Sequence, residues 1–113
     1  MDSILTSIKV LLGIEPECTQ FDKPLIEHIN AAFMTLNQLG VGPDNPVFIT
    51  GDLETWVNKF GDISRIQAIK TYIYIKVKLV FDPPTNSSYM GILEKQAMEL
   101  EERLIIQLES KEG

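Results

Sequence analysis

The sequence predicts a mainly α protein, a small bundle of four principal helices with one irregular excursion around residues 41–60. Three observations predict it. Apolar residues recur every three or four positions along four segments. Gly, Pro and Asn separate these segments. A chain of 113 residues, 44% hydrophobic and 23% charged, has the length and composition of one globular domain. We therefore expect a single domain over residues 1–113.

The first helix is expected from about Ser3 to Leu12. Asp2 or Ser3 can accept hydrogen bonds from the free N–H groups of the first turn, and Gly13 suits the C-terminal end. Pro16 then prevents the helix from continuing. One face of this helix is apolar and consists of Ile4, Leu5, Ile8, Leu11 and Leu12.

The second helix is expected to begin at a cap formed by Asp22. Phe21 and Ile26 flank this cap at the spacing of a hydrophobic staple. Gly40 and the pair Gly42-Pro43 end the run after about 18 residues, a length that makes this segment a candidate for the central helix. Its apolar face consists of Leu25, Ile29, Ala32, Phe33 and Leu36.

The excursion around residues 41–60 combines turn signals with a short β-prone run. Asn45-Pro46 marks a turn, and residues 47–49 (Val-Phe-Ile) favour a strand. Residues 50–52 form a second predicted turn, which would cap a short helix through Trp56 and Phe60. Whether residues 47–49 form a strand is left open, because one short strand must pair with another segment or with a neighbouring subunit.

The segment from Ile63 to Phe81 fits two patterns. Its apolar residues alternate as in a strand between Tyr72 and Leu79, yet the series at helical spacing is unbroken from Ile63. No turn residue interrupts it, and about 20 residues is far longer than a usual strand. We therefore predict a helix. It is apolar around much of its circumference, which indicates contacts on more than one side.

The last helix is expected after Pro83-Pro84, capped by Ser87 or Ser88. Its stripe is more typical of intramolecular core than of a partner-facing helix whose end projects beyond Leu104, and both alternatives stay open. The stripe consists of Leu93, Ala97, Leu100, Leu104 and Leu108. Across the bundle, the residues predicted to be buried are Ile29, Phe33, Leu36, Ile73, Val77, Leu93, Ala97 and Leu100.

Composition excludes several functions. The net charge of -6 disfavours specific DNA binding, which relies on clustered Lys and Arg. Cys18 is the only cysteine, so no intramolecular disulfide or cysteine-based zinc site is expected. No apolar run is long enough to span a membrane, and no signal peptide is expected, so the protein should stay in the cytoplasm where it is synthesised.

Few residues have the surroundings that chemistry requires. His28 has no second His or Cys to complete a metal site, and Glu15 and Glu17 near Cys18 oppose thiolate formation. The glycines of residues 40–43 lack the Lys-Ser/Thr of a phosphate loop. The basic and aromatic cluster within residues 70–78 is interpreted as the exposed side of a buried helix. We predict no catalytic, cofactor or metal site and no enzyme activity.

Three phrases occur in one order along the chain. FMTLNQLGVGP spans Phe33 to Pro43, Thr55-Trp56 precedes Phe60-Gly61-Asp62, and the third phrase consists of Tyr72, Lys76, Phe81, Asp82, Pro83 and Pro84. Together they resemble the head-tail connector proteins of long-tailed bacteriophages and prophages of Gram-positive bacteria. The chain departs from that pattern at Lys78, where an arginine is expected, and in lacking a second aromatic in the last helix.

The resemblance implies a mostly helical head-completion adaptor and structural virion protein at the head-tail junction, synthesised in the host cytoplasm. It implies a ring of about a dozen copies beneath the portal protein. This ring extends the channel through which DNA passes without specific binding, and it receives the next head-completion (stopper) or tail protein. The alternative, from composition alone, is a small acidic helical regulatory or protein-interaction module without a virion role.

The apolar residues of the excursion and of the C-terminal tail have no obvious partner within the chain. We therefore expect them to become ordered on assembly and to contact other subunits. The predicted interface residues are Val41, Val47, Phe48, Ile49, Trp56, Phe60, Leu104, Ile105 and Leu108.

Overall fold

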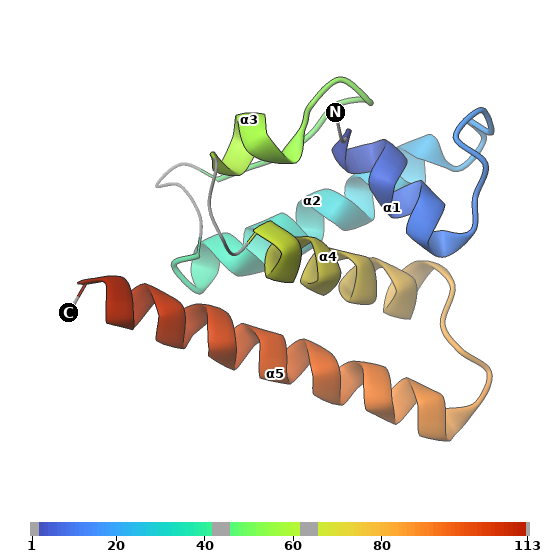
Figure 1. The fold of residues 1–113 in the computed structure, drawn as a ribbon. Coiled ribbons are helices and arrows are strands. Elements are labelled where there is room, and N and C mark those ends of the chain that lie inside the picture. The colour runs from blue at the N-terminus through green and yellow to red at the C-terminus, as the bar shows by residue number, and fades with distance from the viewer. Residues whose placement is uncertain (1–2, 42–45, 62–65, 113) are drawn as a thin grey trace.

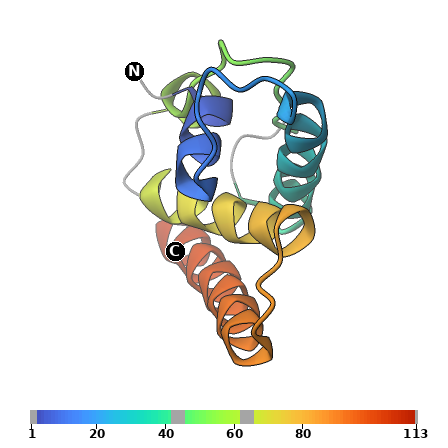
Figure 2. The same ribbon diagram turned by 90° about the vertical axis from the view of Figure 1, so that its right-hand side faces the viewer.

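The computed structural model describes residues 3–41, 46–61 and 66–112, with the side chains of the last helix as far as Ile106. These residues form five helices, α1 (Ile4–Leu12), α2 (Asp22–Gln38), α3 (Trp56–Phe60), α4 (Ile66–Phe81) and α5 (Ser87–Glu112). Helix α4 lies in the middle, with α1, α2 and α3 on one side and α5 on the other (Figures 1 and 2). The predicted mainly α bundle is confirmed.

Helix α4 is the segment whose sequence fits both a helix and a strand, and it is a helix. It contacts each of the other four helices, so the contacts expected on more than one side are present. Helix α4 is therefore the central helix. The sequence had instead favoured α2 for this position because of its length. The expected start at Ile63 lies outside the described residues. The buried side chains of α4 are Ile69, Tyr72, Ile73, Ile75 and Val77.

Helix α1 begins and ends as predicted. The Ser3 hydroxyl accepts a hydrogen bond from the Thr6 N–H at 3.2 Å. Gly13 adopts a φ of 83°, which a residue with a side chain rarely adopts, and this lets the Ile14 N–H donate to the Lys9 carbonyl at 2.8 Å. The predicted apolar face is too wide at its end, because Leu11 is exposed.

The predicted cap of α2 is wrong. Asp22 is the first residue of the helix, and no side chain caps this end. Its carboxylate instead accepts a hydrogen bond from the Lys9 ammonium at 2.8 Å. The cause is a long-range interaction. The buried Lys9 ammonium on α1 requires an anionic partner, and this ion pair outweighs the local preference of aspartate for the cap position.

Two further caps differ from the prediction by a few residues. Helix α3 is capped by the Thr55 hydroxyl, which accepts from the Asn58 N–H at 3.2 Å, rather than by the turn at residues 50–52. Helix α5 is capped by Asn86, whose side-chain oxygen accepts from the Ser88 and Tyr89 N–H groups at 2.8 and 3.1 Å. Side chains with short polar groups compete for such positions, so sequence alone places caps only approximately.

Lys9 is the one charged residue that is buried in the part of the chain the structure describes, with 2% of its surface exposed. Its ammonium donates to the Pro16 carbonyl at 3.0 Å as well as to Asp22. These two bonds tie α1 to the connection that follows it and to the start of α2. A buried cation that lost them would be strongly unfavourable, so the pair fixes how α1 meets α2.

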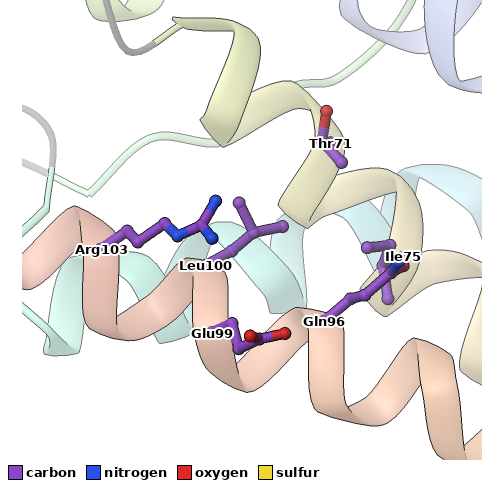
Figure 3. A pocket seen from close by; sticks show the side chains of 6 residues that line it. All are labelled: Thr71, Ile75, Gln96, Glu99, Leu100 and Arg103. Carbon is purple, nitrogen blue, oxygen red and sulfur yellow. The ribbon is translucent and has the colours of Figure 1, made fainter.

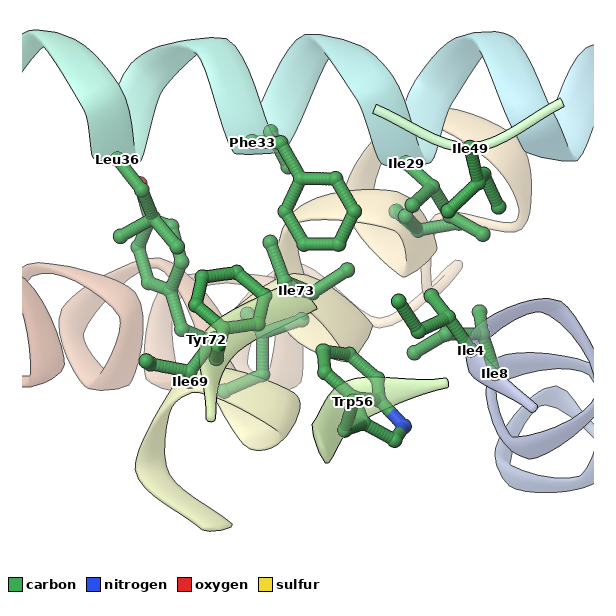
Figure 4. Packing of buried hydrophobic residues seen from close by; sticks show 14 of the residues in the cluster. Ile4, Ile8, Ile29, Phe33, Leu36, Ile49, Trp56, Ile69, Tyr72 and Ile73 are labelled. Carbon is green, nitrogen blue, oxygen red and sulfur yellow. The ribbon is translucent and has the colours of Figure 1, made fainter. Parts of the chain in front are cut away.

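Phe33, Trp56 and Phe60 form an aromatic cluster in the core, and Figure 4 shows the first two of these rings. The ring of Phe33 on α2 lies 6.2 Å from that of Trp56, nearly perpendicular to it, and 5.5 Å from that of Phe60. The Trp56 indole N–H donates to the Ser7 hydroxyl at 2.9 Å, so its one polar group is satisfied. These ring contacts bind α3 to the bundle despite its length of five residues.

Seven of the eight residues predicted to be buried are buried, and Leu100 is only partly buried. Leu100 packs against the core from the edge of α5, whereas Leu104, one turn later, is completely covered. The two leucines lie on one helix but differ in how much apolar surface they remove from water. They form a matched pair for measuring what α5 contributes to stability.

We expect Leu104→Ala to lower the free energy of unfolding by about 2–5 kcal/mol, because the substitution leaves a cavity between α4 and α5. Leu100→Ala should cost only about 1 kcal/mol, since its site already opens to solvent. Urea denaturation followed by circular dichroism measures both values. Equal losses for the two variants would contradict this placement of α5.

We expect Asp22→Ala to destabilise the fold more than Lys9→Met. The first change leaves a buried ammonium with only one carbonyl acceptor, at a cost of about 1–3 kcal/mol. The second removes the charge and keeps an apolar side chain of similar length in the same place. Urea midpoints of the two variants test the order, and a larger loss for Lys9→Met would refute it.

Candidate subunit interface

Ile49, in the segment that leads toward α3, is held by a side chain rather than by a neighbouring strand. Asn30 on α2 accepts a hydrogen bond from the Ile49 N–H at 2.7 Å and donates to the Ile49 carbonyl at 2.9 Å. A single amide thus makes the two bonds that a neighbouring strand would make. Residues 47–49, which the sequence left open between strand and loop, form no strand.

The next residues form a turn that Glu54 closes, which we call the Leu53 turn (residues 50–54). The Glu54 carboxylate accepts from the Thr50 N–H at 2.8 Å, the Thr50 hydroxyl at 3.0 Å and the Gly51 N–H at 3.3 Å. Burial raises the pKa of Glu54, but hydrogen bonds, chiefly from Thr50, outweigh it and leave that pKa below its ordinary value. The Glu54 carbonyl accepts from the Ile4 N–H at 2.9 Å, which fastens the turn to α1.

The Leu53 turn and the segment that leads into it each present one large apolar side chain to solvent. Leu53 is 87% exposed and Phe48 is 59% exposed. Asp52, beside Leu53, is also exposed. Leu53 was not among the interface residues predicted from the sequence, because a single leucine among the polar turn residues Gly51, Asp52 and Glu54 is no specific signal of an interface.

The nine predicted interface residues do not share one location. Five are buried within the chain itself: Val41, Ile49, Trp56, Phe60 and Leu104. The premise that these residues lack an intramolecular partner is therefore wrong. Val47 and Ile105 are half-buried, Phe48 is exposed, and the side chain of Leu108 lies outside the described residues. Of the nine, Phe48 thus offers the largest known apolar surface to a partner.

A groove of about 290 Å³ lies between α4 and α5 (Figure 3). We call it the α4/α5 groove. Ile75 and Leu100 give it apolar walls, and both α4 and α5 contribute polar groups to its rim. An apolar centre with a polar rim is the usual anatomy of a protein–protein contact. Its lining residues are Thr71, Ile75, Gln96, Glu99, Leu100 and Arg103.

A smaller hollow of about 140 Å³ lies between α2 and α4. Its lining includes His28, which is half-buried with its ring centroid 6.4 Å from that of Phe81. Cys18 is a half-buried free thiol. In the described ranges no three His, Cys, Asp or Glu side chains gather as a metal site would require. The same ranges contain no helix of the length and hydropathy needed to cross a bilayer.

The family model for phage connector proteins matches residues 4–111, nearly the whole chain. The chain belongs to this family. The resemblance read from three short phrases is thereby confirmed. No curated protein and no solved structure matches the chain. Family membership supports a structural connector role in a phage particle.

Beside its groove, the connector ties α5 to α4 through one buried hydroxyl. Tyr72 has no exposed surface, and its O–H donates to the Glu101 carboxylate at 2.6 Å. Burial, followed by this hydrogen bond and the negative charge of Glu101, raises the pKa of Tyr72 far above its ordinary value. This bond joins the two helices that form the groove, so it helps to fix the groove's shape.

We expect the connector to lose stability at alkaline pH through Tyr72. Its pKa is raised on folding, so the contribution is complete below the pKa of an unfolded tyrosine, about 10, and is lost as the pH rises from there toward the folded value. Tyr72→Phe should cost about 1 kcal/mol near neutral pH and weaken the decline above pH of about 10. Urea midpoints across this range test it, and an unchanged alkaline slope in the variant would contradict it.

Proposed function

We propose that this connector is the adaptor at the head-tail junction of a phage particle. In this role about a dozen copies form a ring beneath the portal protein, extend the DNA channel and receive the next head-completion or tail protein. The observation that carries the proposal is the family match over residues 4–111. The chain acts as one domain over residues 1–113, and its work is structural rather than enzymatic.

The charge distribution supports passage of DNA without binding. The net charge of -6 opposes binding of a polyanion. Affinity for DNA depends on clustered Lys and Arg, which displace the counterions of the DNA. Helix α5 supplies much of the negative charge on its exposed side, where Glu94, Glu99 and Glu102 face solvent. An acidic lining would let the genome move through a channel instead of holding it.

The arrangement of the helices supports a role between two different partners. The Leu53 turn and α3 lie on one side of α4, and α5 lies on the other (Figures 1 and 2). These two sides differ chemically, which suits head-to-tail contacts between neighbouring copies, and a ring joined in this way has two different faces, one for the portal protein and one for the following protein. The interface residues predicted from the sequence remain proposals within this scheme, with Phe48 the most accessible of those whose side chains are described.

We expect the purified connector to associate stably with its cognate portal protein and to bind DNA negligibly at physiological salt. Native mass spectrometry of the mixture reports the stoichiometry, and a gel shift with DNA of varied sequence reports the affinity. Disruption of the gene should give heads that package DNA but do not retain it or gain tails. A plasmid copy of the intact gene is the control and should restore tailed particles.

Two outcomes contradict the proposal in different ways. Tailed, infectious particles formed without the protein would remove its role at the junction. Tight, sequence-specific binding to a DNA fragment would instead favour the small regulatory module, because that activity requires base contacts that a channel lining avoids.

A further inference from the structure

The connector carries an apolar projection on one side and an apolar groove on the other. Leu53 is the most exposed of its large apolar side chains whose exposure is known. The α4/α5 groove has the partly buried Leu100 and the nearly covered Ile75 in its walls. Helix α5 lies on the opposite side of α4 from the Leu53 turn (Figures 1 and 2), and the groove lies between α4 and α5, so the turn is remote from the groove of its own chain.

One charged residue beside the turn and one on the rim of the groove are opposite in sign. Asp52 precedes Leu53 and is exposed, and Arg103 stands on the rim of the groove. Neither side chain makes an ion pair with any residue that the structure describes. Glu99 also lines the groove but is not paired with Arg103, so the guanidinium is available to an incoming carboxylate. Arginine binds carboxylates in a paired geometry, which would orient the turn.

We propose that the Leu53 turn of one subunit docks in the α4/α5 groove of the next. Leu53 inserts between Ile75 and Leu100, and Asp52 pairs with Arg103 at the rim. The proposal rests on the proposed function, because it names the contact that joins neighbouring copies of the ring. A projection and a groove on opposite sides of one chain make a head-to-tail contact, the type that repeats around a ring until it closes.

The rigidity of the turn supports docking. Asn30 holds Ile49, the Glu54 carboxylate holds Thr50 and Gly51, and the Glu54 carbonyl holds Ile4. Leu53 is therefore presented on a turn whose backbone is hydrogen-bonded within its own chain. Preorganisation of this kind reduces the conformational entropy lost on binding, so one apolar side chain and one ion pair contribute more than they would from a flexible loop.

A disulfide experiment tests the contact in the assembled protein. Cys18→Ser removes the native thiol, and Leu53→Cys with Gln96→Cys then places one thiol on the turn and one in the groove. Mild oxidation, with and without portal protein, should give a ladder of covalent multimers longer than dimers. Either cysteine alone can give only dimers, and Leu53→Cys with Glu102→Cys is the matched control, since Glu102 is exposed on the same helix and does not line the groove.

A charge reversal provides the second measurement. Asp52→Arg or Arg103→Asp alone should weaken self-association by about tenfold, and the two changes together should largely restore it, because the pair is then reversed rather than broken. Sedimentation and native mass spectrometry report the assemblies. Circular dichroism confirms folding, which two exposed positions should not disturb.

The outcomes separate this contact from the function on which it rests. A ladder, or recovery in the double charge variant, supports the contact. Rings of normal mass without a ladder and without charge coupling would overturn it and leave the connector role intact. Absence of both self-association and portal binding in the unmodified protein would count against the proposed function and the contact together.

Discussion

The fold depends on covering an apolar helix on several sides. Helix α4 buries five side chains that point in more than one direction around its axis, and each fully buried residue of this kind contributes about 1.5–3 kcal/mol. No single neighbour can cover such a helix. Helices α1, α2 and α3 cover one part of it and α5 covers another. The α4/α5 groove lies beside Leu100, which the packing of α4 and α5 leaves only partly covered.

Local patterns in the sequence were sufficient to predict the helices but not the long-range hydrogen bonds and ion pairs that hold them together. Helical spacing settled α4 in spite of its strand-like alternation, and Ser3 and Gly13 bounded α1 as expected. Asp22 was wrongly predicted to cap α2, because its carboxylate accepts a hydrogen bond from Lys9, thirteen residues earlier in the chain. The state of residues 47–49 was undecidable from the sequence, since their pairing group is the side chain of Asn30 on another element. Contacts between residues that are distant in the sequence produce no periodic pattern from which they could be predicted.

The candidate interface was predicted less well than the fold. Apolar residues in an irregular segment look unpartnered when only neighbours in sequence are considered, yet Trp56 and Phe60 meet Phe33 on α2. Conversely, Leu53 was not predicted as an interface residue, because a single leucine forms no periodic pattern. The groove was not predicted either, because it exists only once α4 and α5 pack together. The functional prediction rested on family-specific phrases, which the family match over residues 4–111 confirmed, and not on any predicted contact.

The bond pair between Asn30 and Ile49 makes the turn sensitive to one chemical change. An amide side chain both donates and accepts, and Ile49 uses both capacities. Deamidation of Asn30 to aspartate would keep the acceptor and convert the donor into an anionic oxygen facing the Ile49 carbonyl. One attraction would then become a repulsion at the backbone of Ile49, whose side chain is buried. Ageing of the protein at this one side chain would therefore loosen the turn while the helical bundle remained folded.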